Sequence, residues 1–163
     1  MLNLPPASSG TQPIILFLCT GNYYRSRMAE EIFNHLAEQQ GQKYQSISRG
    51  LAQNLSTIGN FGSISLYTVK SLESNGYPVQ SRTRLPISVS IQDWESAALV
   101  ICLNQPEHQP MVNKRFPQFA QRVVYWNVPD EGEMPVAEAF RLVQKNVKDL
   151  LSNLDASLLH RTP

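Results

Sequence analysis

The chain has 163 residues, which is enough for one domain with a sizeable core, and 42% of them are hydrophobic, as in ordinary soluble globular proteins. The formal net charge of +1 gives no electrostatic case for nucleic acid or a membrane surface as the main partner. No apolar run approaches the roughly 20 residues that a bilayer span needs. The two cysteines, Cys19 and Cys102, are too few for a disulfide framework and lack the clustered histidines of a zinc site. We therefore expect a cytoplasmic globular protein.

The two ends of the chain are predicted to be short tails around one domain. Residues 1–12 contain proline and serine, but they lack the basic start and the long apolar stretch of a signal peptide. We expect a flexible tail there, a single domain over residues 13–157, and a second short tail over residues 158–163. No internal repeat or linker divides the chain further.

The first half of the chain alternates between strand and helix patterns. The apolar run at 14–18 is continuous, as expected for a central parallel strand that is buried on both faces. A helix is predicted over 26–39, where apolar residues recur at helical spacing until a glycine ends the pattern. A shorter strand is predicted at 44–48, and a second helix at 60–75, before a glycine and a proline.

The second half continues the alternation. Buried strands are predicted at 97–103 and 122–126, and a final helix carries one apolar stripe over 136–154. This order predicts an α/β fold in which a parallel sheet has helices on both faces. In such folds ligands bind beyond the carboxyl ends of the strands, which is where Cys19 follows the first strand.

The segment from Cys19 to Ser26 has the composition of an anion-binding loop with a nucleophile. A cysteine thiol is mostly protonated at neutral pH, but a helix N-terminus and inward-pointing backbone N–H groups favour the thiolate. The same N–H groups can hold phosphate oxygens. Gly21 allows close backbone approach and unusual dihedrals, and Asn22 tolerates the left-handed conformation that a tight loop requires. Arg25 offers a bidentate fork to two phosphate oxygens, and Ser26 either caps the helix or donates to the thiolate.

The run Cys19-Thr20-Gly21-Asn22-Tyr23-Tyr24-Arg25-Ser26, with Ala29-Glu30 shortly after, resembles the signature of the low-molecular-weight protein tyrosine phosphatases. Further similarity lies at 48–50, 97–104 and 126–130. The resemblance implies a Rossmann-like three-layer sandwich of four parallel strands. It also implies two-step hydrolysis of phosphate monoesters through a cysteinyl-phosphate, without a metal or other cofactor.

A proton donor for the leaving oxygen is predicted at Asp130, which follows a predicted strand and so lies at the same sheet edge as Cys19. Asp130 also occupies the position of the family's general acid, with Glu131 and Glu133 as nearby alternatives. The family usually places aromatic residues after this aspartate. Here the acidic residues follow instead, and like-charge repulsion predicts that this rim disfavours acidic phosphopeptides.

Other departures from the family pattern lie in and near the loop. Tyr23 and Tyr24 are candidates for the missing aromatic contact, and Tyr24 stands where many members carry a second cysteine. Arg27 replaces the usual proline, which predicts either a wider substrate tolerance or a solvated side chain. Asn104 replaces a common aspartate at the end of the third strand, so a supporting polar contact is expected to change.

The predicted catalytic residues are therefore Cys19, Arg25 and Asp130, and the predicted substrate is a phosphotyrosine-containing protein or a small phosphomonoester. Phosphate-like oxyanions are expected to inhibit. The predicted substrate-binding residues are Thr20, Gly21, Asn22, Tyr23, Tyr24 and Ser26. Two alternatives are a thiol-dependent arsenate reductase, for which Cys102 is the only further cysteine, and a non-catalytic phosphate-binding module. Cys102 lies within an apolar run and is expected in the core.

Overall fold

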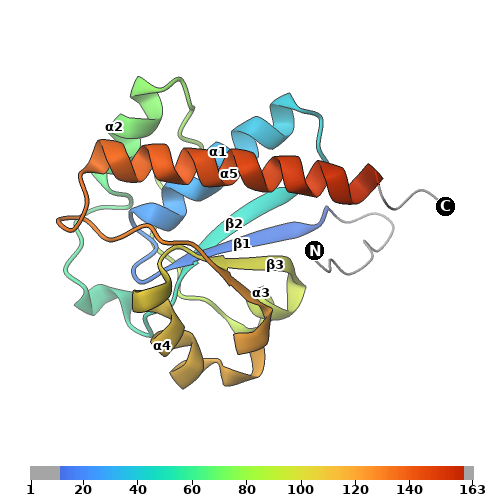
Figure 1. The fold of residues 1–163 in the computed structure, drawn as a ribbon. Coiled ribbons are helices and arrows are strands. Elements are labelled where there is room, and N and C mark those ends of the chain that lie inside the picture. Colours follow the sequence, from blue (N-terminus) through green and yellow to red (C-terminus); the bar gives the residue numbers. More distant parts are fainter. Residues whose placement is uncertain (1–11, 160–163) are drawn as a thin grey trace.

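Four parallel strands form the central layer, in the order β2-β1-β3-β4 (Figure 1). The computed structural model describes residues 12–159 of the chain. The strands are β1 (Ile14–Cys19), β2 (Gln45–Gly50), β3 (Ala97–Cys102) and β4 (Val123–Tyr125). β1 pairs with both β2 and β3, and its residues from Ile15 to Leu18 have no exposed surface. The continuous apolar run thus forms the doubly buried strand that the sequence predicts.

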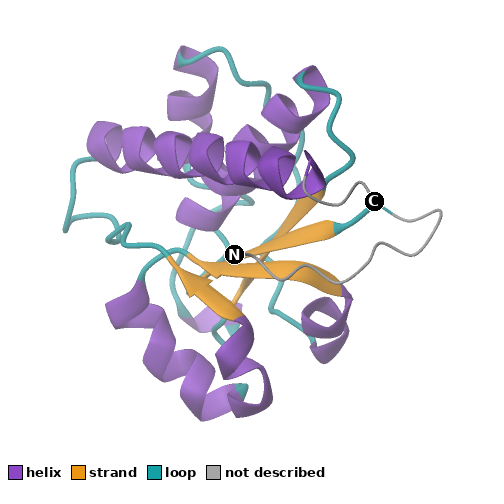
Figure 2. Ribbon diagram, turned by 45° about the vertical axis from the view of Figure 1, so that its right-hand side comes forward, coloured by secondary structure: helices purple, strands orange, loops and turns teal. Residues whose placement is uncertain are grey.

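Helices cover both faces of the sheet, as Figures 1 and 2 show. One face carries α1 (Arg25–Gln39), α2 (Leu66–Ser74) and α5 (Val136–Leu159), which pack on alternate β1 residues such as Ile15 and Phe17. The other face carries α3 (Ile91–Ser96) and α4 (Gln105–Arg115), which pack on Leu16 and Leu18. The predicted three-layer α/β sandwich is therefore confirmed. None of the helices in residues 12–159 has the length and apolar character that a bilayer span requires.

The strand order places the switch point between β1 and β3, because the chain moves outward from β1 to β2 and then returns to the other side. The connection after β1 leads into α1 on one face, and the connection after β3 leads into α4 on the other face. These two connections separate at the carboxyl edge of the sheet. Open α/β sheets bind their ligands in the crevice at such a point.

Most predicted elements agree with the structure to within one or two residues, with two exceptions. The helix predicted at 60–75 begins only at Leu66, because Gly59 and Gly62 adopt positive φ angles of 82° and 75° and Ser65 caps the helix through the Tyr67 N–H. A short 3₁₀ turn, Leu55–Thr57, precedes it. The last helix continues beyond 154 to Leu159.

Helices α3 and α4 and the 3₁₀ segment Pro117–Arg122 were not predicted. Helix α3 has only six residues, and it is recognisable mainly by the capping box between Ser90 and Asp93. Helix α4 contains Pro110 in its interior and has little apolar periodicity, so the usual helix pattern is missing. Of the predicted tails, residues 1–11 and 160–163 lie outside the described residues.

Candidate active site

The loop between β1 and α1 turns its carbonyl groups outward and leaves its N–H groups free. The carbonyls of Cys19, Thr20 and Tyr23 accept hydrogen bonds of 2.8, 3.1 and 3.0 Å from the backbone N–H groups of Leu51, Ala52 and Ser65. Within residues 12–159, no protein acceptor is found for the backbone N–H groups of residues 20–25. A ring of unpaired N–H donors directly before a helix forms a site for an anion.

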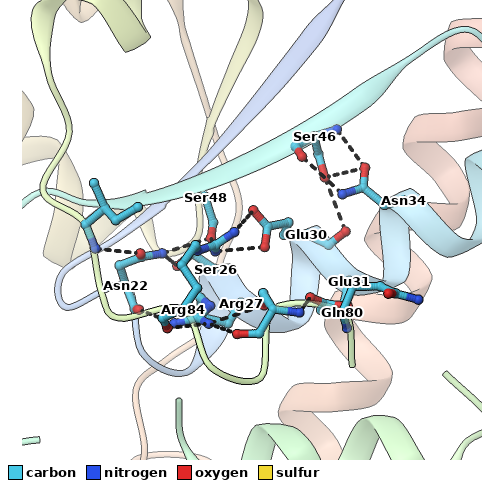
Figure 3. A network of polar contacts seen from close by, with 12 residues as sticks. Asn22, Ser26, Arg27, Glu30, Glu31, Asn34, Ser46, Ser48, Gln80 and Arg84 are labelled. Atoms are coloured by element: carbon cyan, nitrogen blue, oxygen red, sulfur yellow. Dashed lines mark hydrogen bonds and ion pairs between the residues drawn. The ribbon is translucent and has the colours of Figure 1, made fainter. Parts of the chain in front are cut away.

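Asn22 fixes the shape of this loop. Its φ angle is +51°, which confirms the predicted left-handed conformation. Its side-chain oxygen accepts from the Ile87 N–H at 3.0 Å, and its amide nitrogen donates to the hydroxyls of Ser26 and Ser48 at 3.0 and 2.9 Å. Figure 3 shows the Asn22 side chain beside Ser26 and Ser48. Asn22 has no exposed surface, so its side chain supports the loop from behind.

Cys19 and Ser26 face each other across the loop. The Sγ atom lies 3.0 Å from the Ser26 hydroxyl oxygen, and the cysteine is 3% exposed. Because the Asn22 amide nitrogen can only donate, Ser26 accepts there and keeps its own proton for the sulfur. Ser26 is therefore placed to donate to a thiolate. The alternative prediction of a helix cap at Ser26 is wrong, since Tyr24 holds the N-cap position and makes no side-chain cap bond.

Arg25 is only 2% exposed and is held at one edge of its guanidinium. Its Nη1 and Nη2 atoms donate to the two carboxylate oxygens of Glu107 at 3.0 and 2.7 Å, and Nη1 also donates to the Val128 carbonyl at 3.0 Å. Its Nε atom is buried and has no hydrogen-bond partner among the described residues. The Nε–H and the second Nη2–H thus form the free edge, and two such donors match two oxygens of a phosphate. Burial opposes the charge of Arg25, but the bond to Glu107 raises its pKa overall.

Asp130 lies next to this guanidinium. One carboxylate oxygen is 3.5 Å from Arg25 Nη2, and the side chain is 51% exposed. The same oxygen accepts the backbone N–H of Glu131 at 2.8 Å, which holds the carboxylate at the end of its loop. Glu131 borders the same cavity as Asp130, whereas Glu133 is exposed and does not border it. Of the three acidic candidates, Asp130 has the position closest to the loop arginine.

A cavity of about 410 Å³ opens above the loop. Of the predicted residues, Cys19, Arg25, Asp130, Thr20, Gly21, Tyr23 and Tyr24 border it, and Asn22 and Ser26 do not. Ile58 and Asn60 complete the wall, and no motif in the sequence marks them. Gly21 does not adopt a positive φ angle. Its missing side chain leaves room for Asn60, whose Nδ2 would lie 3.2 Å from an added Cβ.

The two loop tyrosines differ in their surroundings. Tyr24 is buried, and burial together with the charge of Glu131 raises its pKa to about 12. Tyr23 is half-buried, and its hydroxyl donates to the Phe61 carbonyl. Phe61 itself is 90% exposed beside the cavity wall. Apolar surface at the rim of the cavity therefore comes from the segment after β2 and not from the segment after Asp130.

Arg27 corrects a prediction, because it is neither solvated nor in contact with the cavity. It has no exposed surface. Its guanidinium donates to the backbone carbonyls of Asn22, Ser63, Ser81 and Arg84, at distances from 2.8 to 3.3 Å. Figure 3 shows Arg27 beside the ion pair of Arg84 and Glu30, whose bonds measure 2.8 and 3.1 Å. Arg27 thus ties the anion loop to two neighbouring loops.

Within residues 12–159, no group of three or more histidine, cysteine, aspartate or glutamate side chains is arranged to hold a metal ion. The site consists instead of a cysteine and an arginine in an anion-binding loop, at the carboxyl edge of a parallel sheet. These features define the class of cysteine-dependent phosphatases.

Comparison with protein families is consistent with this class. The model of the family described as "Low molecular weight phosphotyrosine protein phosphatase" matches residues 14–161. The chain therefore belongs to this family, and its activity is that of a phosphatase. A search of curated proteins finds no match.

Several solved structures share the fold. The low molecular weight protein tyrosine phosphatase from T. tengcongensis has 22% identity and a TM-score of 0.73, over 86% of this chain and 99% of that chain. Wzb from Vibrio vulnificus, solved in complex with benzylphosphonate, has 15% identity and a TM-score of 0.73, over 86% and 98%. The YwlE arginine phosphatase from Geobacillus stearothermophilus has 20% identity and a TM-score of 0.74, over 93% and 98%.

Proposed function

We propose that Cys19, Arg25 and Asp130 carry out the hydrolysis of phosphotyrosine or a similar aryl phosphate in two steps. The observation that carries this proposal is the convergence of three groups on one cavity. These are the Cys19 sulfur within a ring of free N–H donors, the unpaired edge of Arg25, and the Asp130 carboxylate 3.5 Å from that arginine.

In the first step the Cys19 thiolate attacks phosphorus and the bond to the leaving oxygen breaks. The loop N–H groups and the free edge of Arg25 bind the equatorial oxygens, where negative charge increases in the transition state. Protonated Asp130 gives its proton to the leaving oxygen, so a neutral phenol or alcohol departs. The product of this step is a cysteinyl-phosphate.

In the second step Asp130, now a carboxylate, accepts a proton from water as the water oxygen attacks phosphorus. The sulfur–phosphorus bond breaks, inorganic phosphate forms, and the sulfur leaves as a thiolate. The Ser26 hydroxyl, 3.0 Å from the sulfur, donates to that thiolate and so lowers the cost of its departure. No metal or other cofactor is needed for either step.

The walls of the cavity support an aryl phosphate as substrate. Tyr23, Ile58 and Asn60 border one side, and the acidic pair Asp130 and Glu131 borders the other. A flat ring would fit between them, and Vibrio vulnificus Wzb, which shares the fold, was solved in complex with benzylphosphonate. The acidic side favours peptides that carry basic residues next to the phosphorylated one. We also propose a cytoplasmic location, in which the free thiols of Cys19 and Cys102 stay reduced.

An arsenate reductase that recycles its own sulfur would need a second thiol near Cys19. Cys102 is fully buried, and its strand position pairs with Leu18 and not with Cys19. Since neighbouring residues of a strand point to opposite faces, the two thiols lie on opposite sides of the sheet. Burial also raises the pKa of Cys102. This geometry gives the arsenate reductase hypothesis no support, except with an external thiol.

The first test is hydrolysis of p-nitrophenyl phosphate by the wild type, Cys19→Ser and Asp130→Ala. We expect near-total loss in Cys19→Ser, a severe loss in Asp130→Ala, and inhibition of the wild type by vanadate. Asp149→Ala, which removes an exposed aspartate on α5, is the matched control and should retain wild-type activity. Wild-type turnover no higher than that of Cys19→Ser would refute catalysis and favour a phosphate-binding module. Peptides with phosphotyrosine or phosphoarginine, flanked by basic or acidic residues, then define the substrate.

A further inference from the structure

Glu107 is the main partner of Arg25, although it lies in helix α4, outside every segment that the sequence marks as functional. Its two carboxylate oxygens bond to both Nη atoms of Arg25 at 3.0 and 2.7 Å. The Glu107 side chain is 27% exposed, whereas that of Arg25 is 2% exposed. A bidentate pair of this kind fixes the plane of the guanidinium as well as its position.

Two further residues hold Glu107 in place. The Thr20 hydroxyl, from the anion loop, donates to one Glu107 oxygen. His108 is fully buried, and its Nδ1 atom accepts the backbone N–H of Asn104 at 3.0 Å. The neutral imidazole therefore carries its proton on Nε2, which lies 3.0 Å from the same Glu107 oxygen and donates to it. The carboxylate is thus fixed from three directions by Arg25, Thr20 and His108.

We propose that Glu107, held by His108 and Thr20, is the positioning residue that keeps the free edge of Arg25 directed at the bound phosphate. This inference rests on the proposed function of Arg25 as the phosphate-binding arginine. The supporting polar contact that was expected to change at Asn104 is supplied here by Glu107, about one helical turn further along the chain. Among the described residues, Asn104 itself makes backbone contacts alone, as N-cap of α4 and donor to His108.

The alternative partner of Arg25 shows why positioning matters. The Asp130 carboxylate lies 3.5 Å from Arg25 Nη2, which is within the distance of an ion pair. Without Glu107, the buried guanidinium would turn toward Asp130, because that is the other carboxylate within ion-pair distance among the described residues. The phosphate-binding edge of Arg25 and the proton donor Asp130 would then be paired with each other, and neither would be free to act on the substrate. Glu107 limits this pairing to the long 3.5 Å contact, because it satisfies Arg25 from the opposite edge.

The decisive variant is Glu107→Gln, because electrostatics and positioning predict opposite results. Removing a negative charge near the loop would by itself strengthen the binding of a phosphate anion. Loss of the positioning contact instead weakens it. We expect the dissociation constant for inorganic phosphate to rise about tenfold, with a parallel rise in KM for p-nitrophenyl phosphate and a smaller fall in kcat. Glu95→Gln, which removes an exposed carboxylate from α3 at the opposite edge of the sheet, is the control and should change neither value.

Phosphate binding is measured by calorimetry in the Cys19→Ser background, so the result does not depend on turnover. If the wild type fails to hydrolyse phosphate esters, the proposed function fails, but the binding comparison still tests Glu107. Thr20→Val provides a second, isosteric variant that removes one support of Glu107, and we expect about threefold weaker phosphate binding. Unchanged or tighter phosphate binding in folded Glu107→Gln, or in Thr20→Val where Glu107→Gln does not fold, would overturn the inference.

Discussion

Replacement of the buried Arg27 by methionine tests how the anion loop is held. Methionine has a similar length but no donors, so Arg27→Met leaves the carbonyls of Asn22, Ser63, Ser81 and Arg84 without their shared partner. These carbonyls belong to the anion loop and to two loops beside it. We therefore expect a less stable protein whose cavity wall, attached through Ser63, is also less ordered.

The magnitude follows from the contacts of Arg27. A hydrogen bond from a charged donor contributes roughly 1.5–3 kcal/mol. Four carbonyl acceptors at the lower figure give about 6 kcal/mol as an upper value. Several of these carbonyls are only part-buried and regain water in the variant, so we expect a loss of about 3–4 kcal/mol. For a chain of this length that corresponds to a fall in Tm of about 10 °C.

Urea unfolding and thermal unfolding measure this loss directly. Arg27→Lys keeps the charge but has a single nitrogen to share among the carbonyls, so it should lose about half as much. Arg141→Met, at an exposed position on α5, is the matched control and should remain close to the wild type. If the free energy of unfolding of Arg27→Met lies within about 1 kcal/mol of the wild-type value, these hydrogen bonds contribute little and the reasoning is wrong.

Three further predictions concern the loop and its surroundings. Gly50→Ala should reduce kcat/KM by at least tenfold while the protein stays folded, since the added Cβ would lie 3.0 Å from the Thr20 carbonyl and displace the anion loop; wild-type kinetics would contradict this. Burial alone would raise the pKa of Glu107, but hydrogen bonds from His108 and Arg25 lower it well below its usual range. Its contribution to stability is therefore complete above about pH 4.3 and declines as pH falls further, so the unfolding free energies of wild type and Glu107→Gln should converge in acid. Iodoacetamide at neutral pH should modify Cys19 and leave the buried Cys102 intact, as mass spectrometry of digested protein would show. Labelling of Cys102 that added phosphate prevents would contradict this.

The parts of the site that the sequence predicts are those formed within one short segment. Cys19, Asn22 and Arg25 lie within seven residues, and their roles depend on the turn between β1 and α1. The positive φ of Asn22 could be anticipated because few other residues tolerate that conformation. Asp130 could be placed because the carboxyl ends of parallel strands meet at one edge of the sheet.

The supporting contacts were not predictable, because they depend on side chains from distant segments. Arg27 follows the motif directly, yet its burial results from loops that bring Ser63 and Ser81 around its guanidinium. Glu107 is 82 residues from Arg25 along the chain. It lies in a proline-containing helix with little apolar periodicity, so neither its helix nor its direction could be inferred.

In the proposed mechanism, the sheet order separates the phosphate chemistry from the recognition of the rest of the substrate. β1 lies between β2 and β3, so the loop that follows it has a different neighbour on each side. The segments after β3 and β4 supply the charged groups, Glu107 and Asp130, that act on Arg25. The segment after β2 supplies Ile58 and Asn60, which border the cavity on the side of the loop away from these charged groups' strands. Since the charged groups must keep a fixed geometry to bind one phosphate, substrate preference can change through residues 58–61 while the phosphate-binding machinery stays the same.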